Sequence, residues 1–395
     1  MISFKLFKST YLFLFLLLNF QLISCAQISE LKIETGAERT SLYLNLLKGK
    51  NVAIVANQTS VIFNKNQVAK HLVDSLISLH INVKKVFAPE HGFRGKADAG
   101  EVVKDGFDTR TGLQIISLYG KNKKPSATQL KGIDVVVFDI QDVGARFYTY
   151  ISSLHYVMEA CAEAGIKVII LDRPNPNAHY IDGPVLELAH ASFVGMHKVP
   201  VVYGMTIGEY GKMINGERWL KNGIKCDLKV IPLDNYTHET LYSLPIKPSP
   251  NLPNAKSINL YPSLCFFEGT NVSAGRGTAM QFQIFGSPHL TKSNFTFTPH
   301  ANEGSKYPKY KNKRCFGADL RRVENLNRLH LSYLINAHTQ NSTTEFFNSF
   351  FTKLAGTEKL QKQIEQGLSE IEIRKTWAKG ISTFKKVREK YLLYN

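Results

Sequence analysis

The sequence lacks the short motifs that identify several common enzyme classes. The turn after the first predicted strand, residues 56–60 (ANQTS), contains no GxGxxG, and no GxxxxGK[ST] phosphate loop occurs anywhere. A GxSxG nucleophile elbow is missing as well. These absences argue against a bound dinucleotide or nucleotide and weaken an esterase interpretation, so we expect no cofactor.

Cysteine is scarce, with five residues in 395, and no two of them form a CxxC pair. This spacing argues against a zinc ribbon. His91 and His155 are candidate metal ligands without HExxH spacing, so hydrogen-bonded histidines are the favoured interpretation and no metal is expected. The sequence leaves open whether the four downstream cysteines form disulfides or are buried free thiols: Cys161, Cys226, Cys265 and Cys315.

Long apolar runs are confined to the N-terminus. Residues 11–18 (YLFLFLLL) follow Lys5 and Lys8, and residues 22–25 (LISC) resemble the bacterial lipobox, whose cysteine is lipidated. We therefore predict a lipoprotein signal peptide over residues 1–25 and a lipid on Cys25. This implies a lipid-anchored protein of the cell envelope, periplasmic or outer-membrane associated, that meets the membrane through its anchor only. A plain signal peptide with an incidental cysteine is the alternative.

Basic residues outnumber acidic ones, 49 to 32, which gives a formal net charge of +17. Nucleic acid is the usual partner of so basic a chain. An exported protein more plausibly meets an anionic envelope polymer, so we expect peptidoglycan glycan, whose muramic acid carries a lactyl carboxylate, and no nucleic acid. A merely solvated basic surface is the alternative, and the oligomeric state is not indicated.

Short β-branched runs alternate with helical patterns between residues 50 and 235. This order predicts an α/β fold, with a Rossmann-like parallel sheet covered by helices on both faces. A proline-rich stretch at 248–251 suggests a boundary, with a catalytic domain over 26–248 and a smaller α+β domain over 249–395 that completes the cleft. The predicted strands are 51–56, 83–88, 114–118, 134–140, 167–171 and 228–233; the predicted helices are 67–79, 147–164, 206–220, 357–367 and 371–391.

Polar side chains follow five of these strands where each strand ends. Doubly wound sheets bind ligands outside the carboxyl ends of their strands, so we expect an active site at this edge. The residues at the strand ends include Asn57, Glu90, His91, Arg94, Tyr119, Asp139, Asp142, Arg146, Asp172 and Arg173.

Longer motifs, spread over residues 35 to 395, closely resemble the exo-β-N-acetylmuramidases of the NamZ type. Their length and order are specific to that family. The matching motifs are FAPEHGFRG (87–95), DTRTGL (108–113), SLYG (117–120), FDIQDVGARFYTY (138–150), LDRPNP (171–176), GMTIGE (204–209), PSPNLP (248–253), LYP (260–262), FEGTNVSAGRGT (267–278) and REKYLLY (388–394).

The resemblance implies a Rossmann-like domain and a smaller C-terminal domain with the cleft between them. It also implies an exo-acting glycoside hydrolase that releases N-acetylmuramic acid (MurNAc) from the non-reducing end of peptide-free MurNAc-GlcNAc chains. The proposed catalytic glutamate of the family falls on Glu90. Residues 177–179 (NAH) replace a Gly-Gly-type turn, a departure that concerns a loop at the rim.

Glycoside hydrolysis needs an acid for the leaving oxygen and a second group that activates water or meets the oxocarbenium-like centre. Glu90 is the predicted acid, with pairing to Arg94 as the structural alternative. The candidates for the second carboxylate are Asp139, Asp142, Asp172 and Glu268, of which Asp142 and Glu268 are the favoured pair. Participation of the substrate's N-acetyl group is a further option.

Recognition of the lactyl carboxylate calls for a planar arginine fork, so Arg146, Arg173 and Arg276 are candidates. Tyr148 and Tyr150 can stack on a sugar or pack the following helix. The predicted substrate-binding residues are Asn57, His91, Arg94, Asp139, Arg146, Tyr148, Asp172, Arg173, Asn251, Asn271 and Arg276.

Two other function classes fit part of the pattern. One is a non-catalytic lipoprotein that binds envelope glycan, and the other is an esterase or amidase acting on the same polymer. The intact Glu90 and its surrounding motif argue against the first, and the missing GxSxG motif weakens the second.

Overall fold

The computed structural model describes residues 32–64, 66, 68–94, 105–290, 293–343 and 345–394. From Glu34 onward the chain forms one compact unit. The predicted signal peptide and the predicted lipidation site Cys25 lie outside the described residues. Among the helices of the described part, none is long and apolar enough to cross a membrane.

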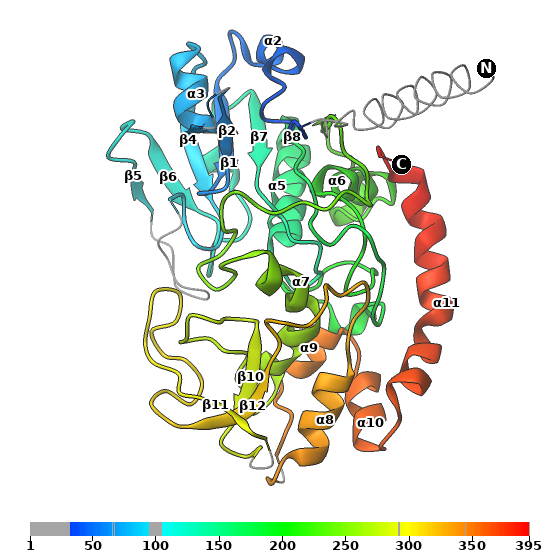
Figure 1. The fold of residues 1–395 in the computed structure, drawn as a ribbon. Helices are drawn as coiled ribbons and strands as arrows, with labels where there is room; N and C mark the ends of the chain where they lie inside the picture. Colours follow the sequence, from blue (N-terminus) through cyan, green and yellow to red (C-terminus); the bar gives the residue numbers. More distant parts are fainter. Residues whose placement is uncertain are drawn as a thin grey trace, which may run out of the picture. The chain divides into compact units, whose positions relative to one another are not determined.

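A seven-stranded sheet organises the first part of the chain (Figure 1). Six strands are parallel, and β5 (Gly106–Phe107) pairs antiparallel at one edge. The parallel strands lie in the order third, second, first, fourth, fifth, sixth along the chain, which is the order of doubly wound dinucleotide-binding folds. In this order the six strands are β6 (Gln114–Ser117), β4 (Val83–Ala88), β1 (Val52–Ala56), β7 (Val135–Asp139), β8 (Lys167–Leu171) and β9 (Leu228–Ile231). All six were predicted, and the Rossmann-like fold is confirmed.

Alternate residues of the central strands pack into two separate cores. Ala53 and Val55 of β1 face the core that holds α5 (Tyr150–Ala164) and α6 (Ile207–Gly216). Val52 and Ile54 face the opposite core, which holds α3 (Leu72–Ser78) and α2 (Leu44–Leu47). Because both faces of β1 are covered, all five of its residues are apolar, as its sequence indicates.

Two helix boundaries differ from the prediction for identifiable reasons. The helix expected from residue 67 begins at Leu72, because β3 (Ala69–His71) pairs instead with β2 (Val61–Phe63) as a hairpin. His71 then caps α3, since its Nδ1 accepts the backbone N–H of Val73 at 3.2 Å. The helix expected over 206–220 is shorter, since Thr206 is the N-cap of α6 and the helix ends at Gly216. Short elements elsewhere are α4 (Ala127–Leu130), η1 (Thr40–Leu42), η2 (Leu188–His190) and η3 (Lys221–Gly223).

The second part of the chain is the C-terminal domain, which has a three-stranded antiparallel sheet flanked by helices, as the α+β prediction required. The sheet order is β10-β12-β11. All four described cysteines, in both parts of the chain, are buried free thiols. The strands are β10 (Ile284–Ser287), β11 (Phe295–Phe297) and β12 (Cys315–Asp319); the helices are α7 (Ala255–Leu264), η4 (Cys265–Gly269), α8 (Ser332–Gln340), α9 (Phe351–Ala355), α10 (Lys359–Glu365), α11 (Glu370–Arg388) and η5 (Glu389–Tyr391).

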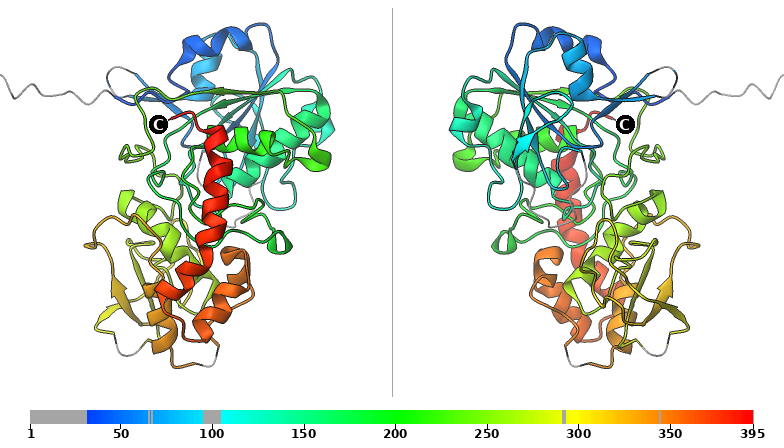
Figure 2. Two further views of the ribbon diagram at one scale, coloured as in Figure 1. Left: turned by 90° about the vertical axis from the view of Figure 1, so that its right-hand side faces the viewer. Right: turned by 90° about the vertical axis from the view of Figure 1, so that its left-hand side faces the viewer.

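The C-terminal segment returns to the parallel sheet, as the red helix α11 shows in Figure 2. The hydroxyl of Tyr394 donates to Oδ2 of Asp172 at 2.7 Å and accepts from the backbone N–H of Leu233 at 2.8 Å. Nε of Arg388 donates to the carbonyl of Gly204 at 2.7 Å. These contacts fasten the end of the chain to the elements around β8 and β9.

Candidate active site

A pocket of about 690 Å³ opens beyond the carboxyl ends of β4, β6 and β7. Its lining comes from both parts of the chain, so the first domain and the C-terminal domain each supply one wall. Six of the predicted site residues line it. They are Glu90, His91, Tyr148, Asn251, Glu268 and Arg276.

Glu90 is fixed at the pocket wall by side chains from two further segments. Tyr119 donates its hydroxyl proton to Oε1 at 2.9 Å, and Thr149 donates to Oε2 at 2.8 Å. Below them, the hydroxyl of Tyr150 donates to the Glu90 carbonyl at 3.3 Å and accepts from Nδ2 of Asn57 at 2.9 Å. Asn57 therefore supports the Glu90 turn from behind the pocket.

The turn after Glu90 has an unusual backbone. His91 has φ of 70° and Gly92 has φ of 76°, so two successive residues adopt the left-handed conformation. A positive φ strains the backbone of a residue that has a Cβ atom, and such strain is common at functional sites. The turn ends β4 abruptly and leaves the Glu90 carboxyl group at the pocket instead of continuing the sheet.

Glu268 and Arg276 form an ion pair on the opposite wall. Nε of Arg276 donates to Oε1 of Glu268 at 2.5 Å, and each side chain is about a quarter exposed. The guanidinium lies over the Phe282 ring, 5.2 Å from its centroid, which adds a cation–π contact. The pair leaves both a carboxylate and a guanidinium facing the pocket.

Asn251 and Tyr148 shape the pocket between these walls. Nδ2 of Asn251 donates to the carbonyl of Gly304 at 2.6 Å, while its buried Oδ1 has no hydrogen-bond partner among the described residues. The hydroxyl of Tyr148 donates to the carbonyl of Pro248 at 2.8 Å. The predicted proline-rich segment is thus part of the pocket wall.

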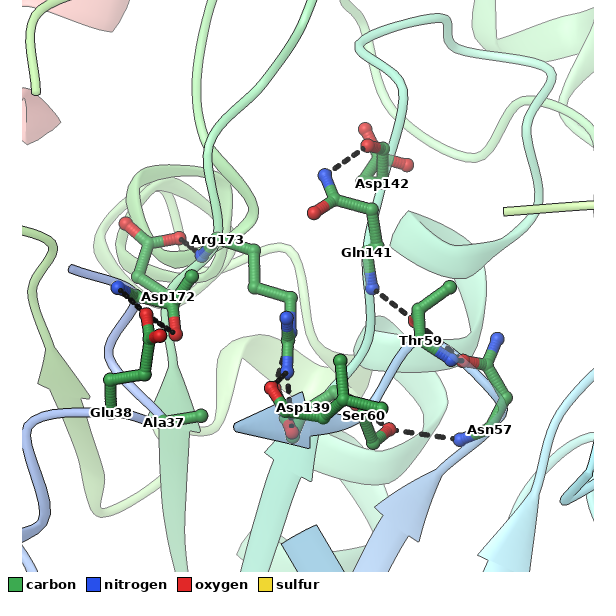
Figure 3. A network of polar contacts seen from close by, with 12 residues as sticks. Ala37, Glu38, Asn57, Thr59, Ser60, Asp139, Gln141, Asp142, Asp172 and Arg173 are labelled. Atoms are coloured by element: carbon green, nitrogen blue, oxygen red, sulfur yellow. Dashed lines mark hydrogen bonds and ion pairs between the residues drawn. The ribbon is translucent and has the colours of Figure 1, made fainter. Parts of the chain in front are cut away.

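Several strand-end residues bind one another (Figure 3) and do not line the pocket. Arg173 binds Asp139 through two hydrogen bonds, Nε–Oδ1 at 2.6 Å and Nη2–Oδ2 at 2.9 Å, and both side chains are buried. Asn57 accepts from Thr59, whose Oγ1 accepts the backbone N–H of Gln141 at 3.1 Å. This network joins the ends of β1, β7 and β8 and does not line the pocket.

Asp142 and Asp172 are also buried away from the pocket. Oδ2 of Asp142 accepts from the Tyr203 hydroxyl and from the backbone N–H of Gly144 at 2.7 Å, while its Oδ1 has no hydrogen-bond partner among the described residues. Burial raises the pKa of Asp142 to about 6, against the opposing effect of these donors. Burial likewise raises the pKa of Asp172 to about 6, although the hydroxyls of Thr206 and Tyr394 act against it.

Three further predicted contacts have other partners. The buried guanidinium of Arg146 donates to four backbone carbonyls, those of Pro184, Val199, Leu354 and Ala355, at 2.7–2.9 Å. Arg94 pairs with Asp108 at 2.8 Å and Asp74 at 3.6 Å. Asn271 bonds Asn341, Thr343 and the carbonyl of Glu345 through its Nδ2. None of the three lines the pocket.

Sequence reasoning missed several pocket residues, chiefly aromatic ones. Tyr119 follows a predicted strand and Thr149 lies within a matching motif, so the sequence position of each pointed to the site. Tyr307 lies in a lysine-rich stretch and had none. The other aromatic side chains that sequence reasoning did not assign to the pocket are Phe147, Phe193, Tyr261, Phe282 and Phe350.

Histidines do not form a metal site in the described part of the chain, where no group of three or more His, Cys, Asp or Glu side chains is arranged to hold an ion. Nδ1 of His155 is 2.9 Å from Nε2 of His197, whose Nδ1 lies 3.0 Å from the Tyr210 hydroxyl. Burial lowers the pKa of both rings, so they are neutral hydrogen-bonding groups.

Two family models together match nearly all of the described chain. The model of the N-terminal part of exo-β-N-acetylmuramidase NamZ matches residues 52–256, and that of its C-terminal part matches residues 259–394. The chain belongs to the NamZ family. The resemblance seen in the sequence motifs is confirmed.

Relatives agree with this membership over most of their length. Peptidoglycan β-N-acetylmuramidase NamZ of Bacillus subtilis (strain 168) is 37% identical over 388 aligned residues, which cover 92% of each chain. A crystal structure of a DUF1343 family protein from Bacteroides fragilis is 46% identical, with a TM-score of 0.84, and covers 92% of this chain and 99% of that one. A second from the same organism is 29% identical, with a TM-score of 0.77 and the same coverage.

Proposed function

We propose that this NamZ family member is an exo-β-N-acetylmuramidase that removes MurNAc from the non-reducing end of peptide-free MurNAc-GlcNAc glycan. The observation that carries the proposal is the pocket geometry around Glu90. Its two carboxyl oxygens accept hydrogen bonds from Tyr119 and Thr149, and a second carboxylate, Glu268, lines the same pocket. Most glycosidases use two carboxyl groups that flank the bond to be cleaved.

Glu90 is assigned as the proton donor to the glycosidic oxygen. Tyr119 and Thr149 fix the orientation of its carboxyl group, which keeps the proton directed at one point in the pocket. Glu268 is the second carboxylate, which activates the attacking water or stabilises the oxocarbenium-like centre. Its ion pair with Arg276 holds the carboxylate in place at the pocket wall. Asp142 has no such access to the pocket.

Arg276 is assigned to the lactyl carboxylate of MurNAc. Of the three arginines predicted for this role, it is the one that lines the pocket. Nε binds Glu268, while the terminal nitrogens of the fork retain N–H donors for an anionic group. The volume of about 690 Å³ lies within the range of ligand pockets and suits a sugar with its substituents. Asn251 supplies an acceptor for a sugar amide or hydroxyl.

Hydrolysis of a chromogenic β-glycoside of MurNAc tests the proposal. The purified protein should release MurNAc and the chromophore, Glu90→Gln should lose most of that activity, and the exposed-site control Glu303→Gln should keep it. Binding without release of MurNAc would favour the glycan-binding alternative. No release of MurNAc from this glycoside, together with release of acetate or of peptide from O-acetylated or peptide-bearing peptidoglycan, would favour an esterase or amidase.

We also propose that the protein is exported and anchored by a lipid on Cys25. The supporting pattern is Lys5 and Lys8 before the apolar residues 11–18, followed by LISC. Metabolic labelling with an alkyne fatty acid, followed by detergent phase partition, tests this localisation. Cys25→Ser should remove the label and release the protein from membranes, with Cys161→Ser as a control that retains both. Unchanged membrane association of Cys25→Ser would contradict the anchor.

A further inference from the structure

Helix α11 runs along the outside of the molecule, with one face packed and the other exposed (Figure 2). Its packed face is apolar, since Ile373, Trp377 and Phe384 are buried in the larger core. These residues recur at intervals of four and seven, which is the spacing of one face of a helix. The opposite face of α11 is therefore the one in contact with solvent.

The exposed face of α11 carries a row of lysines. Lys375, Lys379 and Lys386 are exposed and are separated by four and seven residues, so their side chains leave the helix in nearly the same direction. At about 1.5 Å per residue, the row is roughly 16 Å long. No acidic residue occurs between Glu372 and Glu389. The row is thus a straight line of positive charge on the outside of the helix.

Two further lysines extend this charge at one end. Lys385 is exposed beside the row, and Lys390 follows the helix, where it pairs with Glu217 at 3.2 Å. By contrast, Arg374 is turned toward the protein and binds Asp182 at 2.8 Å. The charge that α11 presents to its surroundings is therefore mainly that of its lysines.

Glu34, where the compact unit begins, lies close to the C-terminal end of α11. The backbones of Glu34 and Asp234 bond each other at 2.9 and 3.2 Å. The next residue, Leu233, donates its N–H to the hydroxyl of Tyr394, which follows the last residue of α11 by six positions. Cys25, the proposed lipid site, precedes Glu34 by nine residues, which span at most roughly 30 Å. A lipid on Cys25, and the membrane that holds it, would lie within that reach of this end of the molecule.

We infer that the lysine row of α11 docks on a membrane surface that carries anionic headgroups. Headgroup charges are spread over a plane, so a straight, exposed row of lysines can approach several of them at once. The choice of this partner rests on the proposed lipid anchor, and the membrane contacted is the one that holds the anchor. The sequence indicated the anchor as the sole contact with the membrane, and α11 adds a second.

Two features favour a membrane over wall glycan as the partner of this face. The row lies on a convex helix surface, and none of its lysines lines the active-site pocket, whereas recognition of a single sugar requires a concave site. The tether also keeps the row near the membrane, which raises its local concentration there. A modest attraction per lysine is then enough to hold α11 against the surface.

Vesicle sedimentation tests the docking surface without the lipid. Residues 26–395 contain the whole compact unit that begins at Glu34, so this part of the chain is used. At low ionic strength it should bind vesicles of phosphatidylglycerol and phosphatidylcholine, and not vesicles of phosphatidylcholine alone. Near 0.15 M salt, where the Debye length is about 8 Å, binding should weaken. Each lysine near an anionic surface contributes roughly fivefold to the partition coefficient, so replacing Lys375, Lys379 and Lys386 by Gln together should lower it roughly 100-fold.

A second triple variant is the matched control. Lys84→Gln, Lys131→Gln and Lys313→Gln together remove the same net charge from exposed positions on other elements. The control should keep the partition coefficient within about threefold of the wild type, because its charges lie away from the row. Glutamine forms helices nearly as well as lysine, so α11 should stay intact in the first variant, which a melting curve checks.

A selective loss of vesicle binding by the α11 variant supports the docking surface. Equal losses for the two triple variants, or equal binding of the wild type to both kinds of vesicle, would overturn it. A wild type that binds neither vesicle would overturn it as well. If the α11 variant lost binding to purified peptidoglycan and kept its binding to vesicles, the row would belong to wall glycan instead. Hydrolysis of MurNAc glycosides and labelling of Cys25 are measured separately, so none of these outcomes decides the proposed function or the anchor.

Discussion

The hydroxyl of Tyr119 donates a hydrogen bond of 2.9 Å to Oε1 of Glu90. The sheet explains why these residues meet. Ala88 of β4 is paired with Ser117 of β6, and Glu90 and Tyr119 each lie two residues beyond that pair. The register of two neighbouring parallel strands therefore aligns the proposed acid with the side chain that orients it.

Tyr119→Phe removes this hydrogen bond without removing the ring. As Glu90 gives up its proton in the transition state it becomes a carboxylate, and a hydrogen bond to a charged group contributes about 1.5–3 kcal/mol, so kcat/KM on MurNAc glycosides should fall roughly 10- to 100-fold. Thermal unfolding should change little, because the variant keeps the ring and its contact with Phe193. Steady-state kinetics with a melting curve check this. Tyr333→Phe, outside the pocket, is the control, and an unchanged rate for Tyr119→Phe would refute the orienting role.

Arg276→Ala removes the guanidinium group that is proposed to bind the lactyl carboxylate. Loss of a charge-assisted pair costs on the order of 2–4 kcal/mol, or roughly 30- to 1000-fold in kcat/KM on MurNAc glycosides. GlcNAc glycosides lack the carboxylate and should lose much less, so the preference for MurNAc should shrink. Arg314→Ala, an exposed substitution outside the pocket, should keep the preference. Equal losses on both substrates would assign Arg276 to the support of Glu268 alone.

Asp142 should make stability depend on pH in an unusual direction. Burial raises its pKa from 3.8 to about 6, so between these values the folded protein binds a proton that the unfolded chain releases. The free energy of unfolding therefore contains a contribution that falls as pH rises through this window, by about 2 kcal/mol from about pH 4.5 to pH 7. Asp142→Asn lacks this contribution.

Urea unfolding of the wild type and Asp142→Asn at several pH values from about 4.5 to above 7 measures the effect. The stability of the variant relative to the wild type should increase with pH and level off above about pH 6.5. Asp227→Asn, at an exposed position, should show no such trend. A constant difference between Asp142→Asn and the wild type across the range would contradict the buried, proton-binding carboxyl group.

Tyr394 should matter for stability and little for catalysis. Tyr394→Phe deprives the buried Asp172 of a donor and leaves the N–H of Leu233 without its acceptor. Unsatisfied buried groups cost about 1–3 kcal/mol each, so the free energy of unfolding should fall by at least that amount. Activity well below the unfolding temperature should persist. Leu393→Ala, at a side chain that is 39% exposed, is the near-neutral control. Equal stability of the two variants would refute the stabilising role of the Tyr394 hydroxyl.

The parallel sheet was predictable because its central strands β1 and β7 are buried at every position and form nearly continuous apolar runs. The hairpin was not, since β2 and β3 have three residues each and are partly exposed. Pairing of Ala69–His71 with Val61–Phe63 overrode the helical spacing that the sequence shows from residue 67. Such pairing depends on tertiary contacts that a local pattern does not contain.

The positions of the strand ends predicted where the site lies, but not which of the residues there face the pocket. Glu90 and Asp172 both follow buried strands, yet one faces the pocket and the other accepts from Tyr394, which lies 222 residues further along the chain. Asp139 and Arg173 satisfy each other. Sequence position gives the edge of the sheet, whereas the direction of each side chain is decided by partners from distant segments.

Hydrolysis of MurNAc-GlcNAc-MurNAc-GlcNAc by the wild type and Glu90→Gln is the most direct test of the proposed reaction. Mass spectrometry should show free MurNAc and the remaining trisaccharide as the first products of the wild type. Glu90→Gln should release MurNAc about 10²- to 10⁴-fold more slowly with an unchanged melting temperature, because the amide keeps the shape of the side chain and has no proton to give. Absence of MurNAc among the wild-type products, or equal rates for the two proteins, would contradict the account.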